Sequence, residues 1–313
     1  MSLDPQVAAY LEEVRQSGAK PYEAMTPQEA RTLELSGGEP ARTPEPVAAV
    51  EHLFIPGPTA DLPVRLYRPA GVTAPEQGMP ALIFFHGSGW MVSNVGTNDP
   101  FARALANRTG AVVVAVNYQK APEHKFPIPM EDCFASTQWV FDHAAALGLD
   151  PQRIGLFGDS AGGNLAAAVA LRCRDEQGPK LACQVLVYPA VQYGLETRSM
   201  VEHGTGYLLE RASMEYYWGH YMRAPTDALH PYCAPLGASD HSQLPPTLIY
   251  CAQYDPLCDD GALYSDKLAR AGVPVQYRVF DGVIHGFIKM LGSCDQADHF
   301  LEVVARDVRP LLG

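Results

Sequence analysis

The chain has 313 residues, of which 47% are hydrophobic and 19% are charged, and its formal net charge is −12 at pH 7. That length and apolar content suffice for one large α/β domain or two small ones. The negative charge argues against nucleic acid and anionic membrane surfaces as partners, and it makes strongly anionic substrates less attractive than neutral ones.

The sequence carries no signal for a membrane span, an export leader or a metal centre. No run of about eighteen apolar residues occurs, and the first residues contain no basic segment followed by an apolar one. The seven cysteines are scattered and form no C-x-x-C pair, which disfavours a zinc site or a disulfide framework. We therefore expect a cytoplasmic protein with buried thiols and no stable membrane insertion.

The N-terminal segment is expected to form an arm. Residues 2–18 place apolar side chains at helical spacing, among them Val7, Leu11 and Val14. Residues 20–47 are polar and rich in proline. The arm therefore cannot build a core of its own, and it must lie on the main domain or be mobile. Two strands follow, at 48–55 and 62–67.

From residue 81 onward, continuous apolar runs are separated by helical stretches. The expected strands cover 81–85, 111–116, 154–157, 185–188, 247–251 and 275–280, and the expected helices cover about 98–109, 130–146, 160–174, 259–271 and 295–309. This alternation predicts a mostly parallel sheet that is covered on each side. Residues 190–232 break the alternation and are rich in aromatic side chains. We interpret them as an insertion over the sheet, and an ordinary pair of surface helices fits their composition nearly as well.

The stretch Gly158-Asp159-Ser160-Ala161-Gly162-Gly163 stands between an expected strand and an expected helix. A G-x-S-x-G match in that context is typical of a nucleophile elbow, where a strained turn presents the serine hydroxyl above the sheet. The amide of Ala161 would lie at the helix N-terminus, where the helix dipole favours an oxyanion. The alternative is a serine that only caps a helix after a glycine turn.

A second stretch, His86-Gly87-Ser88-Gly89-Trp90, follows the expected strand 81–85. A loop with so many small residues can turn several backbone N–H groups toward one point, as an oxyanion requires. A dinucleotide-binding loop is excluded, because Val92 stands where a third glycine would be needed. A plain glycine turn is the weaker alternative, since this loop precedes the strand that leads to Ser160.

Asp255 and His285 each follow the end of an expected strand, where catalytic groups gather in open parallel sheets. The order Ser160, Asp255, His285 is that of the α/β-hydrolases. In such a triad the histidine takes the serine proton and the aspartate orients the imidazole. Asp259 and Asp260 are expected to cap and open the next helix. A metal site on the three aspartates is remote, because no histidine or cysteine ligand stands at suitable spacing.

Together these stretches resemble the hormone-sensitive-lipase-like branch of the α/β-hydrolases, the bacterial family IV carboxylesterases. The resemblance covers nearly the whole chain and extends to residues 118–127, Asp255-Pro256-Leu257 and His285-Gly286-Phe287. It implies an α/β-hydrolase fold with a mostly parallel central sheet flanked by helices. It also implies a catalytic domain at 46–313 under a helical cap, which is formed by an N-terminal arm at 1–45 and an insertion at about 190–232.

The resemblance further implies that the amides of Ser88 and Gly89 join that of Ala161 as oxyanion donors. It also implies a homodimer that pairs through the edge strand 275–280. The chain departs from the family pattern at two places. The family loop usually has glycine where Ser88 stands, and Gln119-Lys120 replaces the usual Arg-Leu. The second change concerns surface contacts rather than chemistry.

We therefore expect a serine carboxylesterase that hydrolyses neutral short-to-medium acyl esters through an acyl-enzyme. Ser160 would be the nucleophile, His285 the general base and acid, and Asp255 the orienter, and no metal or cofactor would be needed. An amidase, a lactonase or a deacetylase would use the same triad, so these activities remain open. A non-catalytic small-molecule receptor would be favoured by loss of the nucleophile or base, and both are present.

Overall fold

A sheet of eight strands crosses the computed structural model, which describes residues 2–36 and 43–313. The strand order is β1-β2-β4-β3-β5-β6-β7-β8. β2 is antiparallel to β1 and β4, and all other neighbours are parallel. The predicted mostly parallel sheet is therefore confirmed. The strands are β1 (Ala49–Pro56), β2 (Asp61–Arg68), β3 (Met79–Phe85), β4 (Val112–Val116), β5 (Leu149–Asp159), β6 (Gln184–Val187), β7 (Thr247–Tyr254) and β8 (Val275–Ile284).

Helices cover both faces of the sheet, which explains why its central strands are apolar throughout. In β5, Leu156 packs into the core beneath α4, α5 and α8, whereas its neighbour Phe157 packs into the core beneath α3 and α9. None of the helices within the described ranges has the length and apolar character to cross a membrane. The covering helices are α3 (Asp99–Thr109), α4 (Ile128–Asp142), α5 (Ala161–Asp175), α8 (Cys258–Arg270) and α9 (Asp295–Leu312).

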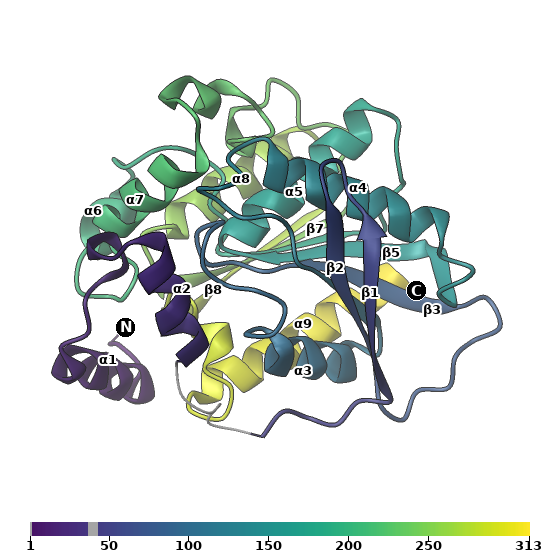
Figure 1. The fold of residues 1–313 in the computed structure, drawn as a ribbon, viewed down its shortest axis with the longest axis horizontal. Coiled ribbons are helices and arrows are strands. Elements are labelled where there is room, and N and C mark those ends of the chain that lie inside the picture. Colours follow the sequence, from purple (N-terminus) through teal and green to yellow (C-terminus); the bar gives the residue numbers. More distant parts are fainter. Residues whose placement is uncertain (1, 37–42) are drawn as a thin grey trace.

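The N-terminal segment and the segment after β6 meet on one side of the molecule, where Figure 1 shows α2 near α7. Ser213 donates to Glu23 at 2.8 Å, and the hydroxyl of Tyr216 donates to the carbonyl of Met25 at 2.8 Å. Residues 1 and 37–42 of the expected arm lie outside the described residues. The helical elements here are α1 (Pro5–Ser17), η1 (Tyr22–Ala24), α2 (Pro27–Ser36), α6 (Arg198–His203), α7 (Arg211–Tyr221), η2 (Pro225–Leu229) and η3 (Pro235–Gly237). The division into cap and catalytic domain stays a prediction.

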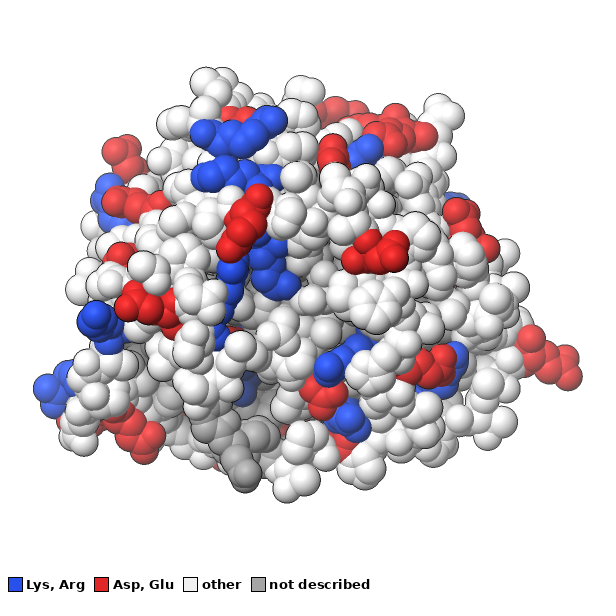
Figure 2. Space-filling view, in the orientation of Figure 1, with Lys and Arg blue, Asp and Glu red and all other residues white. Residues whose placement is uncertain are grey.

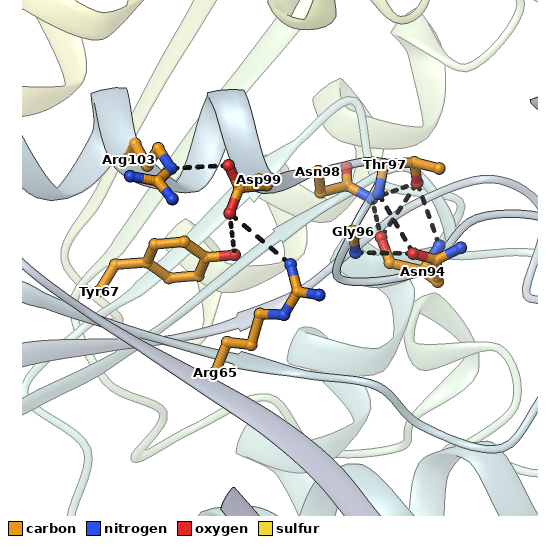
Figure 3. Close-up of polar contacts among 8 residues, drawn as sticks. All are labelled: Arg65, Tyr67, Asn94, Gly96, Thr97, Asn98, Asp99 and Arg103. Atoms are coloured by element: carbon orange, nitrogen blue, oxygen red, sulfur yellow. Dashed lines mark hydrogen bonds and ion pairs between the residues drawn. The ribbon is translucent and has the colours of Figure 1, made fainter. Parts of the chain in front are cut away.

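The connection from β3 to α3 is held by two sets of side-chain contacts (Figure 3). Asn94 closes a turn, because its side-chain oxygen accepts from the amides of Gly96 and Thr97 at 2.6 and 3.2 Å. Asp99, in the first turn of α3, then accepts from the hydroxyl of Tyr67 at 3.0 Å and from Nε of Arg103 at 2.6 Å. These contacts fix the far end of the loop that begins at the carboxyl end of β3.

Charged side chains of both signs lie on the face of the molecule that Figure 2 shows. Acidic side chains are spread over the face shown in Figure 2, and several stand beside basic ones.

All seven cysteines are free, and six are buried, but Cys258 is partly exposed. The expectation of burial is therefore wrong for Cys258, which opens α8 beside the aspartate-bearing loop. β8 is an edge of the sheet, and the dimer expected through it remains a prediction.

Candidate active site

Ser160 lies in the tight turn between β5 and α5. Its backbone has φ 56° and ψ −120°, a conformation that is strained for any residue with a side chain. Glycines let the strand and the helix approach closely at this turn: a Cβ on Gly158 of β5 would lie 2.1 Å from the carbonyl oxygen of Gly162 in α5. The turn leaves Ser160 9% exposed at the carboxyl end of the sheet.

The three residues expected to form a triad are brought together in one line of hydrogen bonds. Nδ1 of His285 lies 2.7 Å from Oδ2 of Asp255, and Nε2 of His285 lies 2.9 Å from Oγ of Ser160. Asp255 is fully buried, and its second carboxylate oxygen accepts from the amide of Leu257 at 2.8 Å. A buried carboxylate held in this way stabilises a protonated imidazole and fixes its orientation.

Tyr188 packs against the histidine, and the sequence pattern did not single it out. Its ring centroid lies 4.3 Å from that of His285. Tyr188 is fully buried, and burial holds the pKa of its phenol well above the usual value. In the sequence, the only signal for Tyr188 was its position at the end of the expected strand 185–188, since the triad residues also follow the ends of expected strands. A neutral ring here limits the orientations that the imidazole can take.

The loop after β3 meets the elbow through Asp159. Oδ1 of this buried carboxylate accepts from the amide of Gly87 at 2.8 Å. The next residues, Ser88 and Gly89, have φ of 86° and 60°. In the described part of the chain, the amides of Ser88, Gly89 and Ala161 make no hydrogen bond. Three free donors beside Ser160 are what an incoming oxyanion would need.

Aromatic residues of α7 pack on the same loop. The Trp90 ring stacks on Tyr221 with centroids 4.3 Å apart, and Trp218 lies 4.5 Å away. Nε1 of Trp90 also donates to Asn164 of α5 at 3.3 Å. A Cβ on Gly89 would lie 2.2 Å from the ring of Tyr217. The segment after β6 thus holds the expected donor loop in place and restricts the space above it.

Asp259 and Asp260 lie in the first turn of α8, but the expectation that they cap this helix is wrong. Leu257 occupies the N-cap position. Oδ2 of Asp259 accepts from the amide of Ser199 at 2.9 Å, and Oδ2 of Asp260 accepts from the amide of Val191 at 3.2 Å. Both carboxylates therefore tie the segment after β6 to the start of α8, which follows the loop that carries the triad aspartate. Asp260 is fully buried, and burial raises its pKa to about 8.

Known proteins share both the sequence and the fold of this chain. Residues 82–289 match the model of the alpha/beta hydrolase fold family. An ethyl acetate hydrolase of Pseudomonas putida is 36% identical, with 97% of this chain and 98% of that protein covered. An arylesterase of Saccharolobus solfataricus is 34% identical, with 98% and 99% covered.

Solved structures agree with these matches. A hyperthermophilic esterase from the archaeon Pyrobaculum calidifontis superposes with a TM-score of 0.92 at 35% identity, and all of both chains is covered. A thermostable esterase from Pseudomonas putida ECU1011 also gives a TM-score of 0.92, at 30% identity, with 100% and 98% covered. The chain therefore belongs to the hormone-sensitive-lipase-like branch of the α/β-hydrolase family and is a carboxylic ester hydrolase.

Proposed function

We propose that this hydrolase cleaves neutral short-to-medium acyl esters through an acyl-enzyme on Ser160. The observation that carries the proposal is the continuous contact from Asp255 through His285 to Ser160, at 2.7 and 2.9 Å. A serine hydroxyl is a weak nucleophile until a neighbouring base takes its proton. The same three residues could act on amides or lactones, and no contact among the described residues favours those substrates.

In the first half of the reaction, Oγ of Ser160 attacks the ester carbonyl carbon while its proton passes to Nε2 of His285. Asp255 accepts from Nδ1 and stabilises the imidazolium that forms. The carbonyl oxygen becomes an oxyanion, which takes hydrogen bonds from the amides of Ser88, Gly89 and Ala161. The imidazolium then protonates the alcohol oxygen as the carbon–oxygen bond breaks, and the acyl group stays on Ser160.

In the second half, a water molecule takes the place of the alcohol. His285 removes a proton from this water as it attacks the acyl carbonyl, and the same three amides hold the second oxyanion. Collapse of this intermediate returns the proton to Oγ of Ser160 and releases the carboxylic acid. Besides the ester and the water molecule, each half-reaction uses only side chains and backbone groups of this chain.

Three observations support small neutral substrates. The Tyr217 ring lies directly against Gly89, so the space above the expected donors is narrow. One relative that matches along its whole length is named for ethyl acetate, an ester with a two-carbon acyl group. A net charge of −12 also disfavours strongly anionic molecules at long range.

Replacing the nucleophile tests the mechanism. We expect Ser160→Ala to abolish the hydrolysis of 4-nitrophenyl acetate and butyrate, and to abolish covalent labelling by a fluorophosphonate, because both reactions need the serine oxygen. Ser265→Ala is the matched control, since Ser265 of α8 is 8% exposed against 9% for Ser160. Melting temperatures of both variants would show that the fold is intact. Substantial turnover by purified Ser160→Ala protein would refute the proposal.

A further inference from the structure

A lysine reaches the loop that is proposed to hold the oxyanion. Lys289 ends a short 3₁₀ helix, η4 (Phe287–Lys289), which begins two residues after His285. Its Nζ donates to Oγ of Ser88 at 3.3 Å. Ser88 is the position at which this chain departs from the glycine of the family loop, so the lysine uses a side chain that the family pattern lacks.

No carboxylate of residues 2–36 or 43–313 pairs with the ammonium group of Lys289. Among the described residues, the serine hydroxyl is its one hydrogen-bond partner, and no ion pair forms there. The two carboxylates of the candidate site have other partners: Asp159 accepts from the amide of Gly87, and Asp255 accepts from His285. Glu23 and Glu34, on the arm, accept from Ser213 and Ser93. Lys289 is an exposed residue, so an incoming anion can reach it.

Ordinary bond lengths limit how far this ammonium lies from the reacting carbonyl. Within one serine, Oγ and the backbone nitrogen are about 3 Å apart, so Nζ of Lys289 lies within about 7 Å of the Ser88 amide. An ester carbonyl oxygen held by that amide is about 3 Å further along. A carboxylate placed two or three methylene groups from the ester carbonyl spans about 4–6 Å, which lets it contact Nζ while the carbonyl is held.

We propose that Lys289 is a specificity residue that binds the carboxylate of esters that carry one negative charge a few atoms from the scissile carbonyl. The proposal rests on the serine mechanism proposed above and extends its substrates from neutral esters to these monoanions. The whole-molecule charge of −12 opposes anions at a distance, but salt screens it beyond about 8 Å at physiological ionic strength. A substrate carboxylate in contact with Nζ of Lys289 is therefore affected more strongly by this ammonium group than by charges elsewhere on the protein surface.

Two matched pairs of substrates test the proposal. Mono-4-nitrophenyl succinate and 4-nitrophenyl butyrate differ by a carboxylate in place of a methyl group on the acyl chain. Then 4-acetoxybenzoate and 4-methylphenyl acetate differ in the same way on the alcohol side. We expect Lys289→Met to lower the charged-to-neutral ratio of kcat/KM by about 3- to 10-fold in at least one pair. Lys289→Arg should keep the ratio, and Lys289→Glu should lower it further.

The control is Lys180→Met, which makes the same change of charge at an exposed residue before β6, at the opposite end of the strands from Ser160. Its ratios should equal those of the unsubstituted protein. The effect of Lys289→Met should also shrink in about 1 M NaCl, because salt screens the ion pair. If both ratios stay within twofold across the three Lys289 variants, Lys289 does not recognise the carboxylate. Failure of the serine mechanism would look different, since neither neutral ester would then depend on Ser160.

Discussion

Backbone strain at the site is concentrated at a few residues. Ser88 and Trp90 have φ of 86° and 57°, and Ser160 has φ of 56°. Residues with a side chain rarely adopt such angles, and each costs on the order of 1–3 kcal/mol. The strain is offset elsewhere by the contacts of Asp159 with the loop and of Trp90 with α7. Stored strain of this kind holds donors in a reactive arrangement before substrate arrives.

Replacing Ser88 by glycine should make the protein more stable. Glycine adopts a φ of 86° without strain, which removes a cost of about 1–3 kcal/mol, and its greater freedom in the unfolded chain takes back about 0.5–1 kcal/mol. We expect Ser88→Gly to raise the free energy of unfolding by about 1 kcal/mol in urea denaturation. Turnover of 4-nitrophenyl butyrate should fall but persist, because the amide donor is kept and the loop is looser.

Ser88→Ala separates strain from the hydroxyl group. Alanine keeps the unfavourable φ but loses the contact with Lys289. It should therefore show no gain in stability. An inactive Ser88→Gly enzyme beside an active Ser88→Ala enzyme would assign the main role of this residue to backbone rigidity. Loss of activity in both would show that the hydroxyl takes part in the reaction.

Asp260 should make stability depend on pH. Its pKa is about 8 in the folded chain, against an ordinary value of 3.8. Between these values the folded state binds the extra proton, so this contribution to stability is complete below about pH 4 and is lost as pH rises through about 8. In an Asp260→Asn variant the side chain stays neutral at every pH, while it accepts from Val191 and donates to a turned Gln192 side chain.

We therefore expect the stability of the unsubstituted protein to fall by about 3 kcal/mol relative to that of the Asp260→Asn variant between about pH 6 and pH 9. Urea unfolding of both proteins at several pH values measures this difference. The comparison cancels every other titrating group that the two proteins share. Parallel pH profiles would mean that Asp260 is ionised in the folded state throughout this range.

Sequence reasoning found the residues that carry a local signature and missed those defined by distant contacts. Ser160, Asp255 and His285 each follow an apolar run, so strand ends alone pointed to them, and the structure brings them within hydrogen-bonding distance. The contact between Lys289 and Ser88 joins residues 201 positions apart. Asp260 was misjudged for the same reason, because a helix start favours aspartate whether or not its carboxylate bonds elsewhere.

At the scale of elements, the expected strands lie where the apolar runs are, but their ends differ. β5 begins at Leu149 and β8 extends to Ile284, whereas the apolar runs suggested a start at residue 154 and an end at residue 280. Polar residues and a glycine interrupt the pattern at these ends, although the backbone continues to pair. The extension of β8 matters for the candidate site, because the strand ends at Ile284 and His285 is the next residue.

The contact of α7 with the loop after β3 lay beyond prediction from periodicity. The aromatic content of 190–232 pointed to a covering segment, but it did not identify the surface that this segment covers. In the structure, Trp218 and Tyr221 pack on Trp90, and Tyr217 packs on Gly89. Aromatic side chains bury large areas and tolerate several partners. The spacing of these aromatic residues in the sequence therefore predicts a helix but does not predict which residues that helix contacts.

At the scale of the whole molecule, the N-terminal arm joins the segment after β6 to the main domain. Arg31 of α2 makes the bridge: its guanidinium pairs with Glu123 at 2.8 and 2.6 Å and donates to the carbonyls of Met91 and Ala121. On its other side the arm contacts α7 through Glu23 and Met25. The arm therefore holds α7 against the loop that carries the proposed oxyanion donors.

Removal of residues 1–36 should consequently impair catalysis more than it impairs the sheet. The truncated chain would keep all eight strands, but α7 would lose its contacts with the arm and the Tyr217 ring would be less constrained above Gly89. We expect kcat/KM for 4-nitrophenyl acetate to fall by about tenfold or more, because small misplacements of donors are costly. The preference for short over long acyl chains should weaken as the space above Gly89 widens.

Smaller changes make the test independent of whether the truncated chain folds. Tyr216→Phe removes one hydrogen bond between α7 and the arm, and Arg31→Ala removes the bridge to the main domain. Each should shift the acyl-chain profile in the same direction by a smaller amount. Circular dichroism and melting would report on the sheet in every variant. An unchanged rate and chain-length profile in a folded truncated protein would show that the arm lies outside the working site, and that α7 alone positions the loop.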